Sequence, residues 1–513
     1  MTASVGRLSQ DKLAESVPLQ PIAERKVHTY DEALAEAGFG RAQIVLTLVA
    51  GLAVMASANE SMGMGMILPA SQCDLDLDLS RKGAIGGAVL LGIMVSTYYW
   101  GYQTDIRGRQ AVLKVTLLTT FAFSVAASCA NNFYVLLVLR FLAGLFISAP
   151  SSAAIVYLGE FCPANRRGQM VTYSCVIGAA GLAYVALVAW WILSYDWLIV
   201  VTESFTIRPW RLLFLINGLP GLAVGIVICF FPETPKFLLA QGRSREALEV
   251  LRWMHRWNKG YDEFYDVYAL QVECQTIDNN VPQKSKNRKV WNQLAPLLKS
   301  PYWIYLAASS IQTASVYVTY GGLGMWFPQI MHLVYSSNSP SNSQFCSIIQ
   351  SSNVSQTIEV TSPSQHACSD TLPPETFIYT LTLGTLCSAF LLLNSLLLSK
   401  FTEKPLIYAN LTAAGLVGVA LQHVSNTYTV AALFCLQIAV GGVTIVLIRS
   451  LQVSIFGTEV KATAVALATL AGRLGQVVSN VLFGTLLVRQ CSGTLYLVAA
   501  LLLLSVALNV LLP

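Results

Sequence analysis

The chain contains a series of apolar runs, each bounded by polar or glycine-containing stretches. A helix that crosses a bilayer needs about 20 mostly apolar residues, and the runs are long enough to meet this requirement. Only 12% of the 513 residues are charged, roughly half the share that is usual in soluble domains. The runs fall near residues 43–69, 83–101, 111–129, 133–157, 169–193, 211–231, 302–330, 376–399, 405–424, 429–453, 461–487 and 493–512. We therefore predict an all-α membrane protein with twelve transmembrane helices.

The distribution of positive charge orients these helices. The polar interval 232–300 carries eleven Lys or Arg residues, whereas the interval 332–377 carries none. Loops on the cytoplasmic side of a membrane are enriched in Lys and Arg. The first interval is therefore predicted to be cytoplasmic and the second exterior or luminal, which places both termini in the cytoplasm. The net charge of +5 is small and does not indicate a nucleic-acid-binding surface.

Six predicted spans precede the interval 232–300 and six follow it. We predict a cytoplasmic N-terminal tail over residues 1–42, a six-helix bundle over 43–231, a cytoplasmic linker over 232–300 and a second six-helix bundle over 301–513. Paired bundles of this kind commonly hold a solute site at their interface near the middle of the membrane. Within the linker, apolar residues repeat at helical spacing from 247 to 254, which predicts a surface helix that packs on the bundles.

The segment 332–374, inside the second bundle, is rich in Ser, Asn and Pro and too polar to cross a bilayer. It holds two cysteines, Cys346 and Cys368, and the glycosylation triplet that begins at Asn353. In an oxidising exterior space these cysteines form the natural disulfide pair, and Asn353 can carry a glycan. The other nine cysteines are scattered singly and are predicted to be small packing residues.

Glu60 and Arg140 are charged residues that lie well inside predicted spans of the first bundle. A charged side chain inside a membrane costs about 2.5–3.5 kcal/mol on insertion scales, so such residues indicate function by default. Glu60 either faces a central cavity as a proton or cation site, or stays protonated and bonds a neighbouring helix. Arg140 either binds an anionic group or influences a proton site, or it merely tethers spans through backbone carbonyls.

In the second bundle, two arginines lie within predicted spans. Arg449 lies near the cytoplasmic end of its span and either lines a cavity or extends its charge to the interface. Arg473 lies nearer the middle of its span among glycine and alanine residues, which permit close helix packing, so it needs an inward-facing partner. Aromatic residues that can form cavity walls, or simply pack, are Tyr173, Tyr184, Tyr317, Tyr320 and Trp326.

Other chemistries leave no trace in the sequence. We find no pairing of a nucleophile with a base, no metal-ligand spacing and no glycine-rich loop suited to phosphate. We therefore predict no enzymatic activity, no cofactor and no metal site.

One polar turn between the second and third spans carries a recognisable pattern. The pattern Gly101-x-x-x-Asp105-x-x-Gly108-Arg109 resembles the loop motif of the major facilitator superfamily, although its usual final basic residue is Gln110 here. The glycines allow a tight turn. Asp105 can pair with arginines of the neighbouring bundle and so form a latch that opens when the bundles rock.

Further elements resemble the same superfamily. Arg140-x-x-x-Gly144 is similar to its fourth-span motif, and Glu160 with Arg166 and Arg167 is similar to its next cytoplasmic signature. Residues 232–238, Pro-Glu-Thr-Pro-Lys-Phe-Leu, resemble the element that follows the sixth span in sugar porters, organic-ion transporters and synaptic-vesicle proteins. The resemblance implies a twelve-helix fold of two six-helix bundles that carries solutes.

The narrower resemblance is to the synaptic vesicle glycoprotein two and SVOP-like branch. It rests on residues 67–69 with 76–83, on Gly-Leu-Gly-Met-Trp-Phe-Pro at 322–328, and on the long exterior loop after span seven. Departures from the pattern are concentrated in the second half, where residues 399–405 lack the Asp, Gly and Arg of the loop motif. The second-half latch is therefore predicted to be weak.

These observations lead to one expected function and one alternative. We predict a secondary active or facilitative transporter that moves a small polar or charged organic solute by alternating access. Glu60 would couple to a proton or a cationic substrate, and Arg473 and Arg449 would offer a counter-site for an anionic group. The alternative is a non-transporting vesicle-trafficking or receptor-like membrane protein. In either case we expect a monomer in the plasma membrane or in an intracellular or synaptic vesicle membrane.

Overall fold

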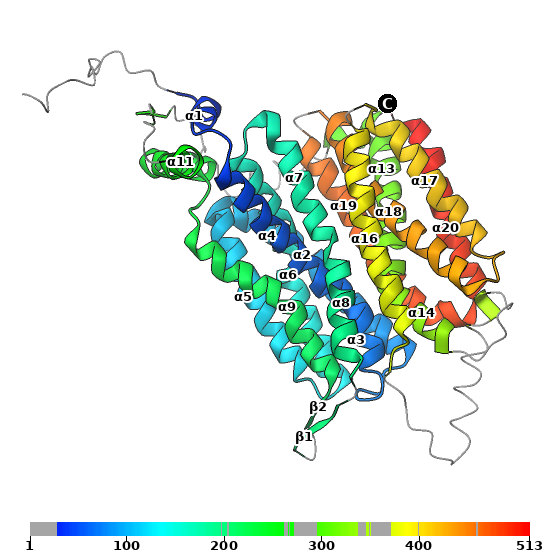
Figure 1. The fold of residues 1–513 in the computed structure, drawn as a ribbon. Helices are drawn as coiled ribbons and strands as arrows, with labels where there is room; N and C mark the ends of the chain where they lie inside the picture. Colours follow the sequence, from blue (N-terminus) through cyan, green and yellow to red (C-terminus); the bar gives the residue numbers. More distant parts are fainter. Residues whose placement is uncertain are drawn as a thin grey trace, which may run out of the picture.

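The structure is a computed structural model in which nearly every described segment is helical (Figure 1). It describes residues 28–195, 197–202, 205–260, 265, 267–270, 295–336, 345–347, 349, 371–398, 400–457 and 460–512. Asn353 and Cys368 lie outside the described residues, so the predicted glycosylation stays a prediction.

The first half of the molecule contains the helices that precede the linker, together with one short hairpin. Its elements are α1 (Tyr30–Glu36), α2 (Arg41–Met62), α3 (Met64–Ala70), α4 (Leu79–Arg107), α5 (Arg109–Ser128), α6 (Phe133–Phe161), α7 (Ala164–Ala179), α8 (Gly181–Leu193), β1 (Ile199–Thr202), β2 (Phe205–Ile207), α9 (Pro209–Val227) and the 3-10 helix η3 (Ile228–Phe230). Strands β1 and β2 pair antiparallel. Two short helices, α10 (Pro235–Ala240) and α11 (Ser244–Lys259), follow in the linker.

The second half is built in a similar way. Its elements are η4 (Ala295–Leu298), α13 (Tyr302–Tyr317), the π-helical segment η5 (Val318–Leu323), α14 (Gly324–Ser336), α16 (Pro374–Leu397), α17 (Glu403–Ala420), α18 (Thr427–Ile455), α19 (Lys461–Arg489), α20 (Cys491–Leu508) and η6 (Asn509–Leu511). We call the face that carries α1, α10 and α11 the linker side, and the opposite face, with β1 and β2, the hairpin side (Figure 1).

Ten helices among the described residues are long and apolar enough to cross a membrane. The continuous helix from Tyr302 to Ser336 and helix α17 are not among these ten. Helix α17 opens with Glu403 and Lys404, which lower its average hydropathy, although it packs beside α18 and α20. The prediction of an all-helical membrane fold is thus confirmed, and ten of the twelve predicted spans pass this test.

Local sequence signals set several helix ends that position the site. Asn132 begins α6 by accepting a hydrogen bond from the backbone N–H of Val135 at 2.9 Å, as expected of an asparagine N-cap. Gly108 separates α4 from α5 with a φ of 95°, a backbone conformation that glycine adopts without strain. The chain therefore turns sharply at the motif that the sequence singled out.

The two halves touch through small residues toward the hairpin side. Helix α4 packs on α19, α3 on α14, and α7 and α8 on α16. A Cβ atom added to Gly484 of α19 would lie 2.8 Å from the carbonyl of Leu79, and one added to Gly65 would lie 2.5 Å from the carbonyl of Met325. Glycine allows this close approach of helices, so side chains larger than hydrogen do not fit at these two contacts.

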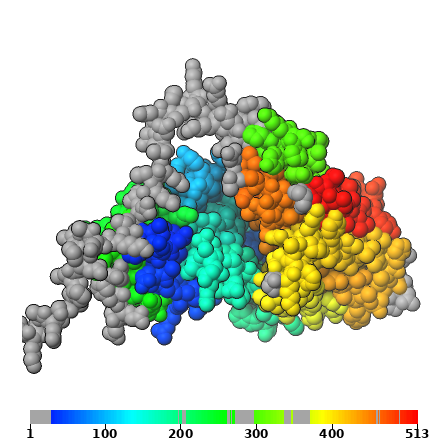
Figure 2. Space-filling model, turned by 90° about the horizontal axis from the view of Figure 1, so that it is seen from above, coloured from blue at the N-terminus to red at the C-terminus, as the bar shows by residue number. Residues whose placement is uncertain are grey.

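On the linker side the halves separate. Seen from that side, Figure 2 shows the surface hollowed between the cyan part of the first half and the yellow and orange helices of the second. The largest apolar cluster includes residues of both halves, among them Met62, Ile67, Trp326 and Phe327. The halves are therefore closed toward the hairpin side and open toward the linker side.

The predicted linker helix is present as α11, and it packs on α1, α2 and α10. Its buried face is formed by Ala247, Leu248, Val250, Leu251, Met254 and His255. Tyr265, which follows α11, donates a hydrogen bond to the carbonyl of Ala33 in α1 at 2.8 Å. These contacts fix the linker helices to the first half.

The predicted disulfide between Cys346 and Cys368 is wrong. Cys346 is bonded instead to Cys491, the first residue of α20, with a Cα–Cα distance of 5.5 Å. Cys73 is also disulfide-bonded, so it and Cys491 are not the simple packing residues that we expected. The error arose because Cys491 lies at the start of an apolar helix, and only the tertiary packing brings that helix end next to the loop.

Candidate functional site

The first half holds a buried ion pair between α2 and α6. The Arg140 Nη1 atom lies 3.1 Å from Glu60 Oε2, and Arg140 Nη2 donates to the Glu60 backbone carbonyl at 2.6 Å. The Arg140 side chain is completely buried and that of Glu60 is 6% exposed. The structure therefore brings together two residues that the sequence had identified separately, and each compensates the charge of the other.

Side chains of two neighbouring helices also contact this ion pair. Ser124 of α5 donates a hydrogen bond to Glu60 Oε1 at 2.6 Å, and the Arg140 guanidinium lies 5.3 Å from the ring centre of Phe214 in α9. Breaking a buried pair typically costs 3–5 kcal/mol, because one uncompensated charge is left out of water. Four helices thus hold Glu60 and Arg140 in one arrangement, inside the first half.

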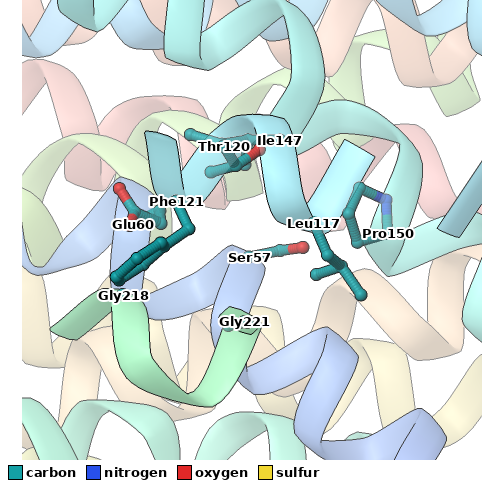
Figure 3. Close-up of a pocket in the computed structure, with 10 residues that line it drawn as sticks. Ser57, Glu60, Leu117, Thr120, Phe121, Ile147, Pro150, Gly218 and Gly221 are labelled. Carbon is teal, nitrogen blue, oxygen red and sulfur yellow. The ribbon is translucent and has the colours of Figure 1, made fainter. Parts of the chain in front are cut away.

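A small space adjoins the Glu60 carboxylate (Figure 3). Figure 3 shows Glu60 and Phe121 at one end of it, Leu117 and Pro150 at the other, and Ser57 between them. Its volume of about 10 Å³ is close to the smallest space that holds one water molecule. The buried Thr120 hydroxyl has no hydrogen-bond partner among the described residues. This space can therefore admit a water or a proton, but not an organic solute.

The second half holds two arginines around one tyrosine. Arg449 of α18 donates a hydrogen bond from Nη2 to Tyr317 Oη at 2.5 Å, and the Arg473 guanidinium of α19 lies 5.3 Å from the centre of the Tyr317 ring. Arg473 also donates to Gln476 Oε1 at 3.2 Å. Neither arginine forms an ion pair with a carboxylate in the part of the chain that the structure describes.

The two arginines border the hollow between the halves. Arg449 is exposed and Arg473 is half-buried, although both lie inside long apolar helices. Arg449 also interacts electrostatically with Cys175 of α7, in the opposite half. On the same helix Tyr173 is 49% exposed. The two arginines therefore lie beside the space that opens to the linker side, whereas the Glu60–Arg140 pair is buried within the first half. Tyr173 is two residues from Cys175 and points to another side of α7, so it is not assigned to this space.

The remaining predicted aromatic residues lie nearer the closed end. Tyr320 packs against α18, where a Cβ atom added to Gly442 would lie 2.6 Å from its ring. Trp326 is 4% exposed and contacts Gly83 and Gly484 at the crossing of α4 and α19. Both are packed residues in this structure, and Trp326 belongs to the contact between the halves.

A buried lysine bridges the halves beside Trp326. The Lys82 ammonium of α4 donates to Gln72 Oε1 at 2.8 Å and, across the interface, to Gln329 Oε1 of α14 at 2.7 Å. Lys82 is 3% exposed. The sequence does not single out Lys82 as a site residue, because its burial depends on how α14 packs.

The loop motif on the linker side forms a charge network within the first half. Arg109 Nη2 lies 3.2 Å from Asp105 Oδ1 and 3.2 Å from Glu160 Oε1. The prediction that Asp105 pairs with arginines of the neighbouring bundle is not met in this conformation. The Asp105 side chain is 73% exposed, as expected where the halves are separated.

Glu233 is a residue of this network that we did not predict as a site residue. Its Oε1 atom accepts hydrogen bonds from the backbone N–H of Arg109 at 3.0 Å and of Thr234 at 2.9 Å, and it also bonds the N–H of Gln110. A carboxylate at the start of a helix satisfies unpaired N–H groups and favours the helix dipole. Glu233 therefore joins the linker to the start of α5.

Other motif residues are arranged around this network. The Arg166 guanidinium lies 4.6 Å from the ring centre of Phe39, and Arg167 donates to the Cys162 carbonyl at 3.4 Å. Tyr30 donates a hydrogen bond to the backbone carbonyl of Glu160. Burial, followed by the nearby Glu160 carboxylate, raises the pKa of the Tyr30 phenol well above its usual range. Gly101 meets no neighbour that would exclude a side chain.

Together these features define a multi-pass integral membrane protein whose two helical halves enclose a charged, linker-side hollow. The Major Facilitator Superfamily sequence model matches residues 49–398, which is more than half of the chain. The chain belongs to this superfamily, as the motifs predicted.

The chain is also similar in sequence to two synaptic vesicle glycoproteins. The chain is 27% identical over 327 residues to human synaptic vesicle glycoprotein 2B, covering 60% of this chain and 48% of that protein. It is 28% identical over 330 residues to rat synaptic vesicle glycoprotein 2A, covering 60% of this chain and 44% of that protein. The chain thus spans about half the length of these relatives, and the predicted resemblance to the synaptic vesicle glycoprotein two branch is confirmed.

Solved structures share the fold. The inward-open conformation of the xylose transporter XylE from E. coli has a TM-score of 0.64 at 15% identity, covering 91% of this chain and 95% of that one. The partially occluded inward-open conformation of the same transporter has a TM-score of 0.61 at 14% identity, covering 91% and 98%. At these identities the likeness concerns the fold alone.

Proposed function

We propose that the protein is a transporter that moves a small organic anion across a membrane by alternating access. The observation that carries this proposal is the arrangement of Arg449 and Arg473 around Tyr317. Two cations reach the hollow between the halves, and no described carboxylate pairs with either of them. A carboxylate or sulfonate on a solute would supply the missing negative charge.

The solute would enter from the linker side. Arg449 borders the hollow there and interacts with Cys175 of α7 in the opposite half, so a solute between the halves can contact this arginine. The tyrosine rings supply apolar surface and the guanidinium groups supply orientation, which is the usual composition of a small-molecule site. Rocking of the halves would then open the hairpin side, where the bond between Lys82 and Gln329 must break.

The Glu60–Arg140 pair would couple this movement to protons. Protonation of Glu60 would remove the charge that compensates Arg140, and a buried unpaired cation is costly. The first half would therefore favour different conformations with Glu60 charged and with Glu60 neutral. Motions of this kind are driven by differential stabilisation of two states. One solved structure with the same fold is that of a D-xylose-proton symporter.

We place the protein, as a monomer, in the plasma membrane or in a vesicle membrane, with the linker side and both termini in the cytoplasm. The excess of Lys and Arg in the linker supports this orientation. The similarity to synaptic vesicle glycoproteins supports a vesicle membrane. The division of the chain at residues 232 and 300 into two bundles and a linker remains part of this proposal.

Uptake into liposomes tests the proposal. The full chain is reconstituted and offered radiolabelled organic anions, organic cations, amino acids and sugars, with and without a pH gradient. We expect uptake of an anion, and we expect Arg473→Gln to lower its rate at least tenfold while the protein remains folded. Arg489→Gln is the matched control, because Arg489 is an exposed residue at the end of the same helix. Equal effects of the two substitutions would exclude Arg473 from the site.

A non-transporting, vesicle-trafficking role is the second candidate. It is favoured by the start of α17, where Glu403 accepts a hydrogen bond from Ser450 and Lys404 donates to the Leu512 carbonyl. These charges bond within the second half instead of forming a latch. This role predicts no uptake of any solute class in the same liposomes, together with normal folding.

A further inference from the structure

An open pocket lies on the linker side, away from the hollow between the halves. It lies between the first turn of α2 and the last turn of α11, and its volume is about 440 Å³. The described residues that line it are Arg41, Ile44, Val45, Arg256 and Trp257. Asn258 fixes its two walls together, because its Oδ1 atom accepts from the Ala42 N–H at 3.0 Å and its amide donates to the Gly38 carbonyl at 2.9 Å.

The pocket is built for negative charge. Arg41 and Arg256 contribute two guanidinium groups, which match the geometry of a phosphate. Arg256 also donates from Nε to the Arg252 carbonyl at 3.4 Å, and two acids of α11, Glu246 and Glu249, pair with arginines near the other end of the helix. Arg41 also occupies the first position of α2, whose opening turn holds no acid. The helix dipole disfavours a cation there, so a bound anion would relieve that repulsion.

An apolar strip continues from the pocket along α2. Arg41, Ile44 and Leu48 lie on one face of the helix, since residues three and four apart are neighbours. The side chains of Ile44 and Leu48 are 60% and 51% exposed. Figure 1 shows that α2 runs along the outside of the first half between α7 and α9. These residues therefore face the acyl chains of the membrane, directly below the two arginines.

Trp257 supports the same placement. Its indole is 43% exposed and contacts Trp253, with a distance of 5.1 Å between the ring centres. Exposed tryptophan is enriched where the headgroups of a membrane meet the acyl chains. A soluble anion would use the arginines but would have no use for an indole and an aliphatic strip.

We propose that this pocket binds the headgroup of an anionic phospholipid from the leaflet on the linker side. The phosphate lies between Arg41 and Arg256, the glycerol backbone lies beside Trp257, and an acyl chain follows Ile44 and Leu48. The lipid thereby joins the linker helix α11 to the first membrane helix. This site does not depend on whether the protein transports a solute.

Native mass spectrometry of the full chain in detergent tests the proposal. The purified protein is titrated with palmitoyl-oleoyl phosphatidylglycerol or with the corresponding phosphatidylcholine. We expect tighter binding of phosphatidylglycerol, and we expect Arg41→Gln with Arg256→Gln to weaken it about 25-fold, since each arginine near an anionic headgroup contributes roughly a factor of five. Phosphatidylcholine binding should not change. The matched control is Arg243→Gln with Arg245→Gln, which removes two exposed charges from the first turns of the same helix.

Three outcomes would overturn the proposal. They are equal binding of the two lipids, equal weakening in the control variant, and displacement of phosphatidylglycerol by excess inorganic phosphate, which would indicate a site for a soluble anion. The thermal unfolding midpoint is measured for each variant. If the double variant is unfolded, Arg41→Gln alone decides the question, with an expected weakening of about fivefold.

Discussion

The two halves of the molecule handle charge inside the membrane in opposite ways. In the first half, Glu60 and Arg140 are both buried and compensate each other at 3.1 Å. In the second half, Arg449 and Arg473 surround Tyr317 and border the hollow, without a carboxylate of the described chain. Under the proposed function, the buried Glu60–Arg140 pair would respond to protons, whereas Arg449 and Arg473 would bind the solute.

The largest expected difference between the halves is in the stability lost when one arginine is replaced in each. Arg140→Gln leaves the Glu60 carboxylate buried and uncompensated, so we expect a loss of about 3–5 kcal/mol in the free energy of unfolding. Arg449→Gln changes an exposed side chain and removes its hydrogen bond to Tyr317, so it should cost less, about 1–3 kcal/mol, while it lowers solute uptake. Chemical unfolding in detergent measures both. Equal losses of stability in the two variants would contradict the difference that we describe between the halves.

The packing around the first-half pair gives a smaller effect. A Cβ atom added to Gly218 would lie 2.9 Å from the Phe121 ring and 3.2 Å from Glu60 Oε1. We expect Gly218→Ala to destabilise the protein by about 1–3 kcal/mol through overpacking. Gly168→Ala is the control, because its added Cβ meets nothing within 4 Å. If the two variants unfold at the same midpoint, the pair is not held as rigidly as we describe.

Replacing both members of the pair tests proton coupling without leaving a buried charge. Glu60→Gln with Arg140→Gln keeps two polar side chains of similar size. A gradient of one pH unit supplies about 1.4 kcal/mol, or at most a tenfold accumulation of solute for one proton. We expect the double variant to remain folded and to lose this gradient-driven accumulation. The ratio of solute inside and outside the liposomes measures it, and an unchanged ratio would place coupling elsewhere.

The smallest expected effect concerns the attachment of α1 on the linker side. Tyr30→Phe removes the hydrogen bond to the Glu160 carbonyl and should cost about 1 kcal/mol. Burial raises the pKa of Tyr30 in the folded state, so this contribution is fully present below the unfolded value of about 10 and falls as the pH rises above it. Unfolding at pH 8 and pH 11 should therefore differ more for the wild type than for the variant.

The exposed Tyr134 provides the control for this measurement. Its side chain is 72% exposed, so Tyr134→Phe should leave both the stability and its pH dependence as in the wild type. If the Tyr30→Phe variant and the wild type lose the same stability at alkaline pH, the Tyr30 phenol does not contribute.

The sequence predicted the elements of this molecule better than their pairing. Apolar run length located the spans, and helical spacing located α11, because both signals are local. Glu60 and Arg140 lie deep in apolar runs, where a charged side chain is energetically costly. This placement identified both as candidate site residues. Their contact depends on the relative positions of α2 and α6, which no spacing within one helix encodes.

The failures have the same physical origin. The disulfide partner of Cys346 is 145 residues away, so proximity in sequence favoured the wrong cysteine. The partner of Asp105 depends on whether the halves are together or apart on the linker side. The burial of Lys82 and the role of Glu233 arise from contacts with α14 and α5, respectively, that only the assembled fold supplies.

The π-helical segment η5 connects the part of the helix beside the arginines to the part that lies between the halves. A π-helical segment interrupts the usual ladder between Tyr317, which faces the arginines, and Trp326, which lies in the crossing of the halves. One residue of an α-helix corresponds to about 100° of rotation about its axis. If the turn rewinds by one residue, α14 swivels against α13, and an event at the arginines is transmitted to the opposite end of the same helix.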